Sequence, residues 1–180
     1  LVRNILQVKT QVLPMSEAPT DLMAFYPEGR CRVGELSVDD MPIMPKSLLL
    51  APLVKAPAPC IDAINKADII VLGPGSFLTS VIPPLLVRDI TKAIKKSSAH
   101  CIFLDNVVKE RSPAAALTID EKLDWIEENT GYQPIHTVIT EDKEMSSSRA
   151  NIIVHDLTCE EVAHHHDKAK LISAVNLLSL

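Results

Sequence analysis

Short apolar runs alternate with segments of helical periodicity through the second half of the chain. Runs rich in β-branched or aromatic residues occupy positions 69–72, 101–104, 137–140 and 152–154. Such runs are typical of strands in a parallel sheet, and we expect 69–72 to be covered on both faces. Because strands alternate with helices, the pattern predicts an α/β fold: a Rossmann-like, mostly parallel sheet with helices on both faces.

Two predicted helices begin at prolines. Pro59 suits the first turn of a helix that ends near Ala67, and Pro83 with Pro84 suits the start of the next helix. We expect this second helix to be continuous, with one apolar face made of Leu86, Ile90, Ala93 and Ile94.

Two later helices have capping signals. Thr118 and Glu121 have the spacing of a capping box, and Gly131 suits the end of that helix. Asp167 is placed to cap a last helix, which carries apolar residues at 171, 172 and 175.

The first third of the chain has a different pattern. Residues 1–6 fit the end of a helix, and residues 11–13 fit a strand that Pro14 stops. Residues 21–36 predict a β-hairpin that turns at 27–29, an excursion that we expect to lie beside the main sheet. A further strand is expected at 47–51.

Composition limits the classes of protein. At 180 residues the chain is most simply one domain, 1–180. The net charge is -5 and aromatic residues make up 3%, without a basic stretch interleaved with aromatics, so a nucleic acid partner is not expected. No membrane span or signal peptide is predicted. Four dispersed cysteines favour free thiols in a reducing cytoplasm.

A glycine loop follows the first of the parallel strands. Gly73 and Gly75 flank Pro74, and hydroxyls follow where a helix would begin, at Ser76, Thr79 and Ser80. Such a loop at the carboxyl end of a strand is suited to bind an anion. A tight strand-to-helix turn with ordinary capping is an equal alternative, because a glycine loop alone is a weak motif.

Other polar residues are expected at the same edge of the sheet. Ser16, Asn106 and the pair 141–142 each follow a predicted strand, so a binding crevice is expected there. Asp105 and Asn106 suit either a ligand contact or a local Asx turn. The motifs of P-loop hydrolases, zinc proteases and serine esterases are absent from the sequence, and spacing alone identifies no catalytic residues.

Three adjacent histidines, 164–166, precede Asp167. Successive residues of a helix or strand point in different directions, so the three cannot all face one ion. We therefore favour a solvated turn that leads into the helix cap over a metal site.

The string from Ala67 to Pro83, with Gly-Pro-Gly-Ser, Thr-Ser and a proline in order, resembles the signature of the gluconeogenesis-factor family. That family belongs to the wider superfamily of 2-phospho-L-lactate transferase (CofD-like). The segment 13–16, the hairpin, Asn106 and the terminal His-Asp helix occur in the same order in the family. Its members open with a further Rossmann-like portion that has its own glycine loop, so the chain, which starts at Leu1, is expected to be a fragment.

The resemblance implies a cytoplasmic regulatory protein that binds a UDP-sugar and supports cell shape and growth on gluconeogenic carbon. The transferase branch implies instead magnesium-dependent transfer of a phospholactyl-type group to a deazaflavin. A ligand-incompetent scaffold is the third hypothesis. The family resemblance, together with the position of Ser16, gives these expected ligand-binding residues: Ser16, Gly73, Pro74, Gly75, Ser76, Thr79, Ser80, Asn106, His165 and His166. No native metal ligand is expected.

The sequence departs from the family pattern at two places. Residues 109–112 are Lys-Glu-Arg-Ser where many relatives have Pro-Gly-Glu-Thr, and His165 stands in place of an arginine. The second change removes an expected charged contact with the ligand. A sheet cut from its domain leaves an open edge, so self-association into a homo-oligomer and exposed apolar surface near 1–13 are expected.

Overall fold

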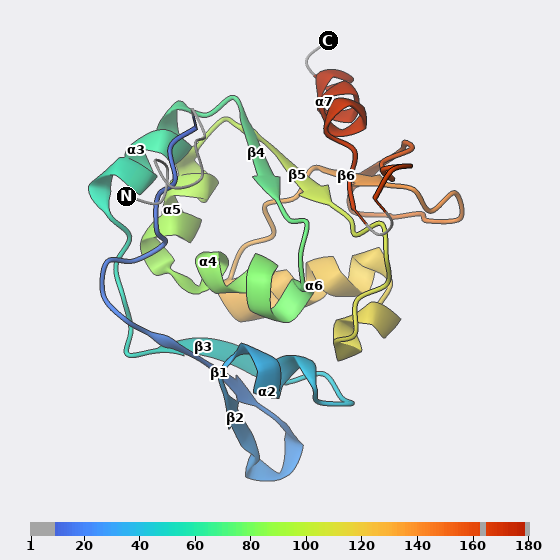
Figure 1. Cartoon of the computed structure of the whole chain (residues 1–180). Coiled ribbons are helices and arrows are strands. Elements are labelled where there is room, and N and C mark those ends of the chain that lie inside the picture. Colours follow the sequence, from blue (N-terminus) through green and yellow to red (C-terminus); the bar gives the residue numbers. More distant parts are fainter. Residues whose placement is uncertain (1–9, 163–164, 179–180) are drawn as a thin grey trace.

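The structure is a computed structural model that describes residues 10–162 and 165–178. It contains a four-stranded parallel sheet and a separate three-stranded antiparallel sheet. Figure 1 shows a layer of helices between the two sheets. The helix predicted at 1–6 lies outside the described residues.

The parallel sheet has the strand order β4 (Ile69–Leu72), β5 (His100–Leu104), β6 (Thr137–Thr140) and β7 (Asn151–Val154). Ile69 pairs with His100, and all three neighbouring pairs are parallel. The crossovers from β4 to β5 and from β5 to β6 carry α5 (Arg88–Lys96) and α6 (Ile119–Thr130). The predicted α/β architecture is confirmed.

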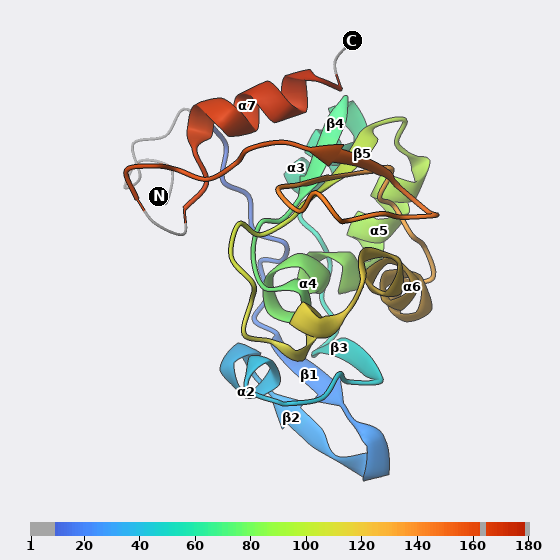
Figure 2. The same ribbon diagram turned by 90° about the vertical axis from the view of Figure 1, so that its right-hand side faces the viewer.

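Side chains of the parallel sheet enter two cores. On β5, Cys101 and Phe103 pack with the helices of one face, whereas Ile102 and Leu104 face the opposite side. The first face carries α3 (Ala58–Lys66), α5 and α6, and the second carries α7 (Lys168–Asn176). Figure 2 shows α7 on the far side of the sheet from α5 and α6. Helices therefore cover both faces.

The predicted hairpin belongs to the antiparallel sheet, whose order is β2 (Cys31–Val33), β1 (Asp21–Phe25) and β3 (Ser47–Ala51). A 3-10 turn, η1 (Pro27–Gly29), closes the hairpin, and α2 (Glu35–Asp39) follows it. This sheet packs on α4 (Ile82–Leu86) and not beside the parallel sheet. The hairpin is therefore part of a second sheet and not a side excursion of the first one. The side chains of Leu22, Leu48 and Leu50 are buried between this sheet and the helices.

Three local predictions were wrong. Residues 11–13 form no strand. β4 is the outer strand of the described sheet rather than a strand covered on both faces, and Val71 is 43% exposed. The expected continuous helix after the glycine loop is a π-helical turn, η2 (Phe77–Val81), followed by α4 and α5. Val87, with ψ of 106°, separates α4 from α5.

The predicted helix ends are confirmed. Thr118 and Glu121 form the capping box of α6, which ends at Gly131 with φ of 74°. Asp167 accepts a hydrogen bond from the backbone of Lys170 at the start of α7. A short 3-10 helix, η3 (Pro113–Ala116), precedes α6. Among the described helices, none has both the length and the apolar character that crossing a membrane requires.

Candidate functional site

The glycine loop leaves the carboxyl end of β4 in a conformation that only glycine tolerates well. Gly73 has φ of +88°, and a Cβ there would lie 2.7 Å from the carbonyl oxygen of Leu104. Gly75 has φ of +146°, and its Cβ would lie 2.8 Å from the Cβ of Ser80. The two glycines therefore let the loop pack against both β5 and the first turn of η2.

Asn106 fixes this loop from the end of the neighbouring strand. Its Oδ1 accepts a hydrogen bond of 2.9 Å from the backbone N–H of Gly75, and its Nδ2 donates one of 3.0 Å to the carbonyl of Gly75. The side chain thus pairs with a loop 31 residues away instead of forming an Asx turn on its own backbone. The ends of β4 and β5 become one polar wall.

Two hydroxyls after the glycines point toward α2, the helix that follows the β-hairpin. Ser76 Oγ and Thr79 Oγ1 each donate a 2.8 Å hydrogen bond to the carboxylate of Asp39, at the end of α2. Thr79 is only 7% exposed. In this arrangement both hydroxyls connect η2 with α2, and their assignment to a ligand stays a prediction.

A second carboxylate holds the backbone of the same loop. Phe77 N–H donates to Glu110 Oε2 at 3.0 Å, and Ser112 Oγ donates to the same oxygen at 2.7 Å. Lys122 Nζ lies 3.7 Å from Glu110 Oε1, with side-chain exposures of 12% for the lysine and 8% for the glutamate. The lysine also lies over the rings of Phe77 and Phe103. A nearly buried ion pair therefore lies under the loop.

Two hollows open at this edge of the sheet and share Asn106 and Val108 in their walls. The first, of about 270 Å³, is lined by Pro74, Gly75, Asn106, Val107, Val108 and His166. The second, of about 310 Å³, includes Asp105, Lys109, Glu110, Lys122 and Asp142. Together they place four predicted site residues and two lysines around one region.

The segment before α7 brings His166 to the site. Glu141 accepts hydrogen bonds from the backbone N–H groups of Leu157 and Thr158 and from the Thr158 hydroxyl. Thr158 pairs with His166 in an antiparallel bridge, and His166 Nε2 lies 3.1 Å from the carbonyl oxygen of Asp105. His166 therefore reaches the end of β5, while Glu141 holds the protein backbone that positions it.

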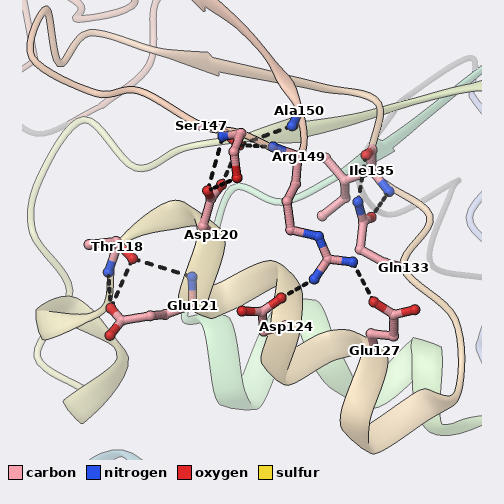
Figure 3. A network of polar contacts seen from close by, with 11 residues as sticks. Thr118, Asp120, Glu121, Asp124, Glu127, Gln133, Ile135, Ser147, Arg149 and Ala150 are labelled. Atoms are coloured by element: carbon pink, nitrogen blue, oxygen red, sulfur yellow. Dashed lines mark hydrogen bonds and ion pairs between the residues drawn. The ribbon is translucent and has the colours of Figure 1, made fainter.

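A polar network on the surface of α6 fixes the loop between β6 and β7. Figure 3 shows Asp120 accepting hydrogen bonds from Ser147, and Arg149 reaching Asp124 and Glu127. The hydrogen bonds from Ser147 and Ser148 lower the pKa of Asp120 to about 2. The same loop supplies Asp142 and Met145 to the second hollow.

Three further predicted site residues line neither hollow. Ser16 makes only local hydrogen bonds, to the backbone of Ala18, and lines neither hollow. Ser80 is exposed, and its backbone N–H donates to the carbonyl of Ser76. His165 accepts at its carbonyl from the Cys159 N–H and lines neither hollow.

The sequence analysis missed Asp39, Glu110 and Lys122. Asp39 lies on a short helix with no motif around it, and the capping box beside Lys122 predicts only where a helix begins, so nothing in the sequence indicated that these two residues approach the loop. Glu110 falls within the four residues that depart from the family pattern, which was the one available signal.

The fold and this edge define an α/β protein with two polar hollows at the carboxyl ends of its parallel strands. The family model described as 2-phospho-L-lactate transferase CofD matches residues 1–177. The chain belongs to this family.

Relatives carry a more specific description. The chain is 38% identical over 179 residues to a putative gluconeogenesis factor from Pasteurella multocida and 42% identical over 178 residues to one from Yersinia pestis. The two matches include 98% and 97% of this chain and 58% of each relative's length.

The fold also matches a solved structure. A crystal structure of a UPF0052 family protein from Bacillus halodurans superposes with a TM-score of 0.84 at 25% identity. The match covers 97% of this chain and 64% of that one. The chain therefore spans roughly three fifths of the proteins that it resembles.

Proposed function

We propose that this chain supplies the phosphate side of a nucleotide-sugar site, with a UDP-sugar as the ligand, in a cytoplasmic regulatory protein of the gluconeogenesis-factor type. The pairing of Asn106 with Gly75 carries the proposal, because it builds one wall for two adjoining hollows. Ligands of α/β sheets bind at this edge. The naming of the relatives supports a role in growth on gluconeogenic carbon, and the resemblance adds cell shape.

Two lysines and three carboxylates line the second hollow, so an anion there would depend on the lysines. Lys122 and Lys109 line it, and the 3.7 Å contact of Lys122 with Glu110 is longer than a hydrogen bond. The lysine N–H groups therefore remain able to donate to a phosphate. Because Lys122 is nearly buried, its charge is weakly screened, and it would act more strongly than an exposed lysine.

Calorimetric titration of the full-length protein with UDP-glucose, with and without magnesium, tests the proposal. Asn106→Asp removes the donor to Gly75 and adds a negative charge to both hollows, so affinity should fall about tenfold or more. Asn151→Asp adds the same charge at the exposed start of β7 and is the matched control. Equal affinities of the two variants would contradict a ligand site at Asn106. No binding by the wild type would favour the hypothesis of a ligand-incompetent scaffold.

Thr79→Ala separates ligand contact from internal support. A hydroxyl that reaches phosphate should change affinity about ten- to hundredfold when removed. A hydroxyl that serves only Asp39 should lower the melting temperature and leave UDP-glucose affinity unchanged. Gly75→Val should abolish binding in either case, because its side chain meets Ser80.

The family description favours a second candidate, a phospholactyl-type transferase that acts on a deazaflavin with magnesium. Asp105 and Asp142 line the second hollow, but Asp105 already accepts from Thr140 and Asp142 from the Glu144 backbone. In the described ranges no three acidic, histidine or cysteine side chains converge as a metal group. These residues therefore fit magnesium poorly on their own.

Mass spectrometry distinguishes the two functions. The protein is incubated with a deazaflavin, a nucleotide-activated phospholactate and magnesium, and the deazaflavin is examined for added mass. Formation of a phospholactyl ester would establish the transferase. Binding of UDP-glucose without any deazaflavin product would support the regulatory role.

A further inference from the structure

A separate cavity of about 490 Å³ lies between β3, α4, α5 and the carboxyl end of α6, whereas the second hollow lies at the amino end of α6. It shares no lining residue with the two hollows at the glycine loop. Its size falls within the range of small-molecule pockets. Six leucines line it: Leu48, Leu49, Leu50, Leu53, Leu85 and Leu86.

The cavity has a cationic rim. Arg88, Lys92 and Lys95 line it, and no aspartate or glutamate does. Within the described ranges none of these three cations is in an ion pair, although Lys95 lies 5.4 Å from the ring centroid of Tyr132. In a chain of net charge -5, three unpaired cations around an apolar floor form a locally positive site.

The backbone of β3 adds a directional group. β3 is an outer strand, and the N–H of Leu48 points away from β1 to Asn129 Oδ1, at 3.3 Å. Because alternate residues of an antiparallel strand point the same way, the N–H and carbonyl of Leu50 also point away from β1. An occupant can therefore meet backbone hydrogen-bonding groups as well as leucines and cations.

We propose that this cavity binds an amphipathic organic anion: a small molecule with an aliphatic or aromatic body and one carboxylate, sulfonate or phosphate group. The body lies against the leucines, and the anionic group meets Arg88 and Lys92. A second copy of the chain fits less well, because a symmetric contact would bring two cationic rims together. This site is independent of the nucleotide-sugar proposal.

Fluorescence titration with 1-anilinonaphthalene-8-sulfonate tests the proposal, and N-phenyl-1-naphthylamine is the neutral analogue. The sulfonate should bind saturably, near one per chain. Lys92→Glu should weaken it about tenfold or more, because the substitution replaces an attraction with a repulsion. The neutral analogue should respond to Lys92→Glu by less than about twofold, since it has no charge to recognise.

Matched variants separate this cavity from general apolar binding. Lys96→Glu makes the same charge change on α5 outside the cavity and should leave sulfonate affinity within about twofold. Leu53→Gln removes apolar surface from the cavity, at a residue 71% exposed, and should weaken both probes. Leu36→Gln, at a residue 83% exposed and outside the cavity, should weaken neither.

Three results would overturn the proposal. Equal responses to Lys92→Glu and Lys96→Glu would show that the rim does not select anions. Equal responses to Leu53→Gln and Leu36→Gln would place the probe elsewhere. Concentration-dependent dimerisation that Lys92→Glu abolishes would make this face an interface between copies.

Discussion

The glycine loop and the leucine-lined cavity differ in how far their polar groups are already paired within the protein. At the glycine loop, backbone N–H groups and hydroxyls are already bonded to Asn106, Glu110 and Asp39, so the loop is held in place before any ligand arrives. At the leucine-lined cavity, the three cations have no ion-pair partner in the described chain. A ligand at the glycine loop would therefore meet a site already shaped by internal hydrogen bonds, whereas a ligand at the cavity would meet cations without an ion-pair partner in the described chain.

The largest effect on stability is expected at Gly73. Gly73→Ala combines a positive φ with a 2.7 Å approach to the Leu104 carbonyl, so unfolding free energy should fall by roughly 2–5 kcal/mol. Gly131→Ala shares the positive φ but meets nothing within 4 Å, and should cost only about 1–2 kcal/mol. Urea unfolding of both variants measures the difference. Equal losses would mean that close packing on β5 contributes nothing.

The ion pair under the loop is expected to come next. Lys122→Met leaves Glu110 nearly buried without its cation, although two hydrogen bonds to it remain, so stability should fall by about 3 kcal/mol. Adding Glu110→Gln should recover part of the loss. A double-mutant cycle in urea measures the coupling, and strict additivity would argue against an interaction between the two side chains.

Substitution of Asp39 tests the connection between α2 and η2. Asp39→Ala removes the acceptor of the Ser76 and Thr79 hydroxyls and should cost about 1–2 kcal/mol. Asp40→Ala, one residue further on and exposed, is the control and should change stability by less than about 0.5 kcal/mol. Thermal unfolding compares them. A loss confined to Asp40→Ala would show that the hydroxyls do not depend on Asp39.

The amino ends of the strands add a pH-dependent element to the comparison. Burial, with a smaller contribution from His136, lowers the pKa of His100 below its usual value of 6.5. As the pH falls, the unfolded chain therefore binds this proton at a higher pH than the folded protein does. The contribution of neutral His100 to the free energy of unfolding is complete above about pH 6.5 and is lost as the pH falls through the lowered pKa. Urea unfolding between pH 7.5 and 5 should show a weaker pH dependence in His100→Gln than in the wild type. Identical dependence would exclude His100 as a contributor.

The smallest effect on stability is expected at the leucine-lined cavity. Leu53→Gln and Lys92→Glu alter exposed side chains and should each change unfolding free energy by less than about 0.5 kcal/mol. Thermal unfolding checks this directly. A loss comparable to that of Asp39→Ala would mean that this cavity, like the glycine loop, is part of the structural framework.

The sequence by itself determined the elements whose causes are local. The parallel strands follow from short apolar runs, and the ends of α6 and α7 follow from Thr118, Gly131 and Asp167, because caps and turns depend on residues within a few positions of one another. The glycine loop and Asn106 were predicted for the same reason, since each directly follows a strand.

Only the tertiary structure decided how these elements meet. An apolar run predicts burial, but the place of β4 at the edge of the described sheet depends on which strands pair. The partners Asp39, Glu110 and Lys122 lie 30 or more residues from the groups they contact at the glycine loop, at positions set by the packing of helices. The leucine-lined cavity likewise combines residues from 48 to 132. Such contacts depend on shape complementarity between distant segments, which local periodicity does not encode.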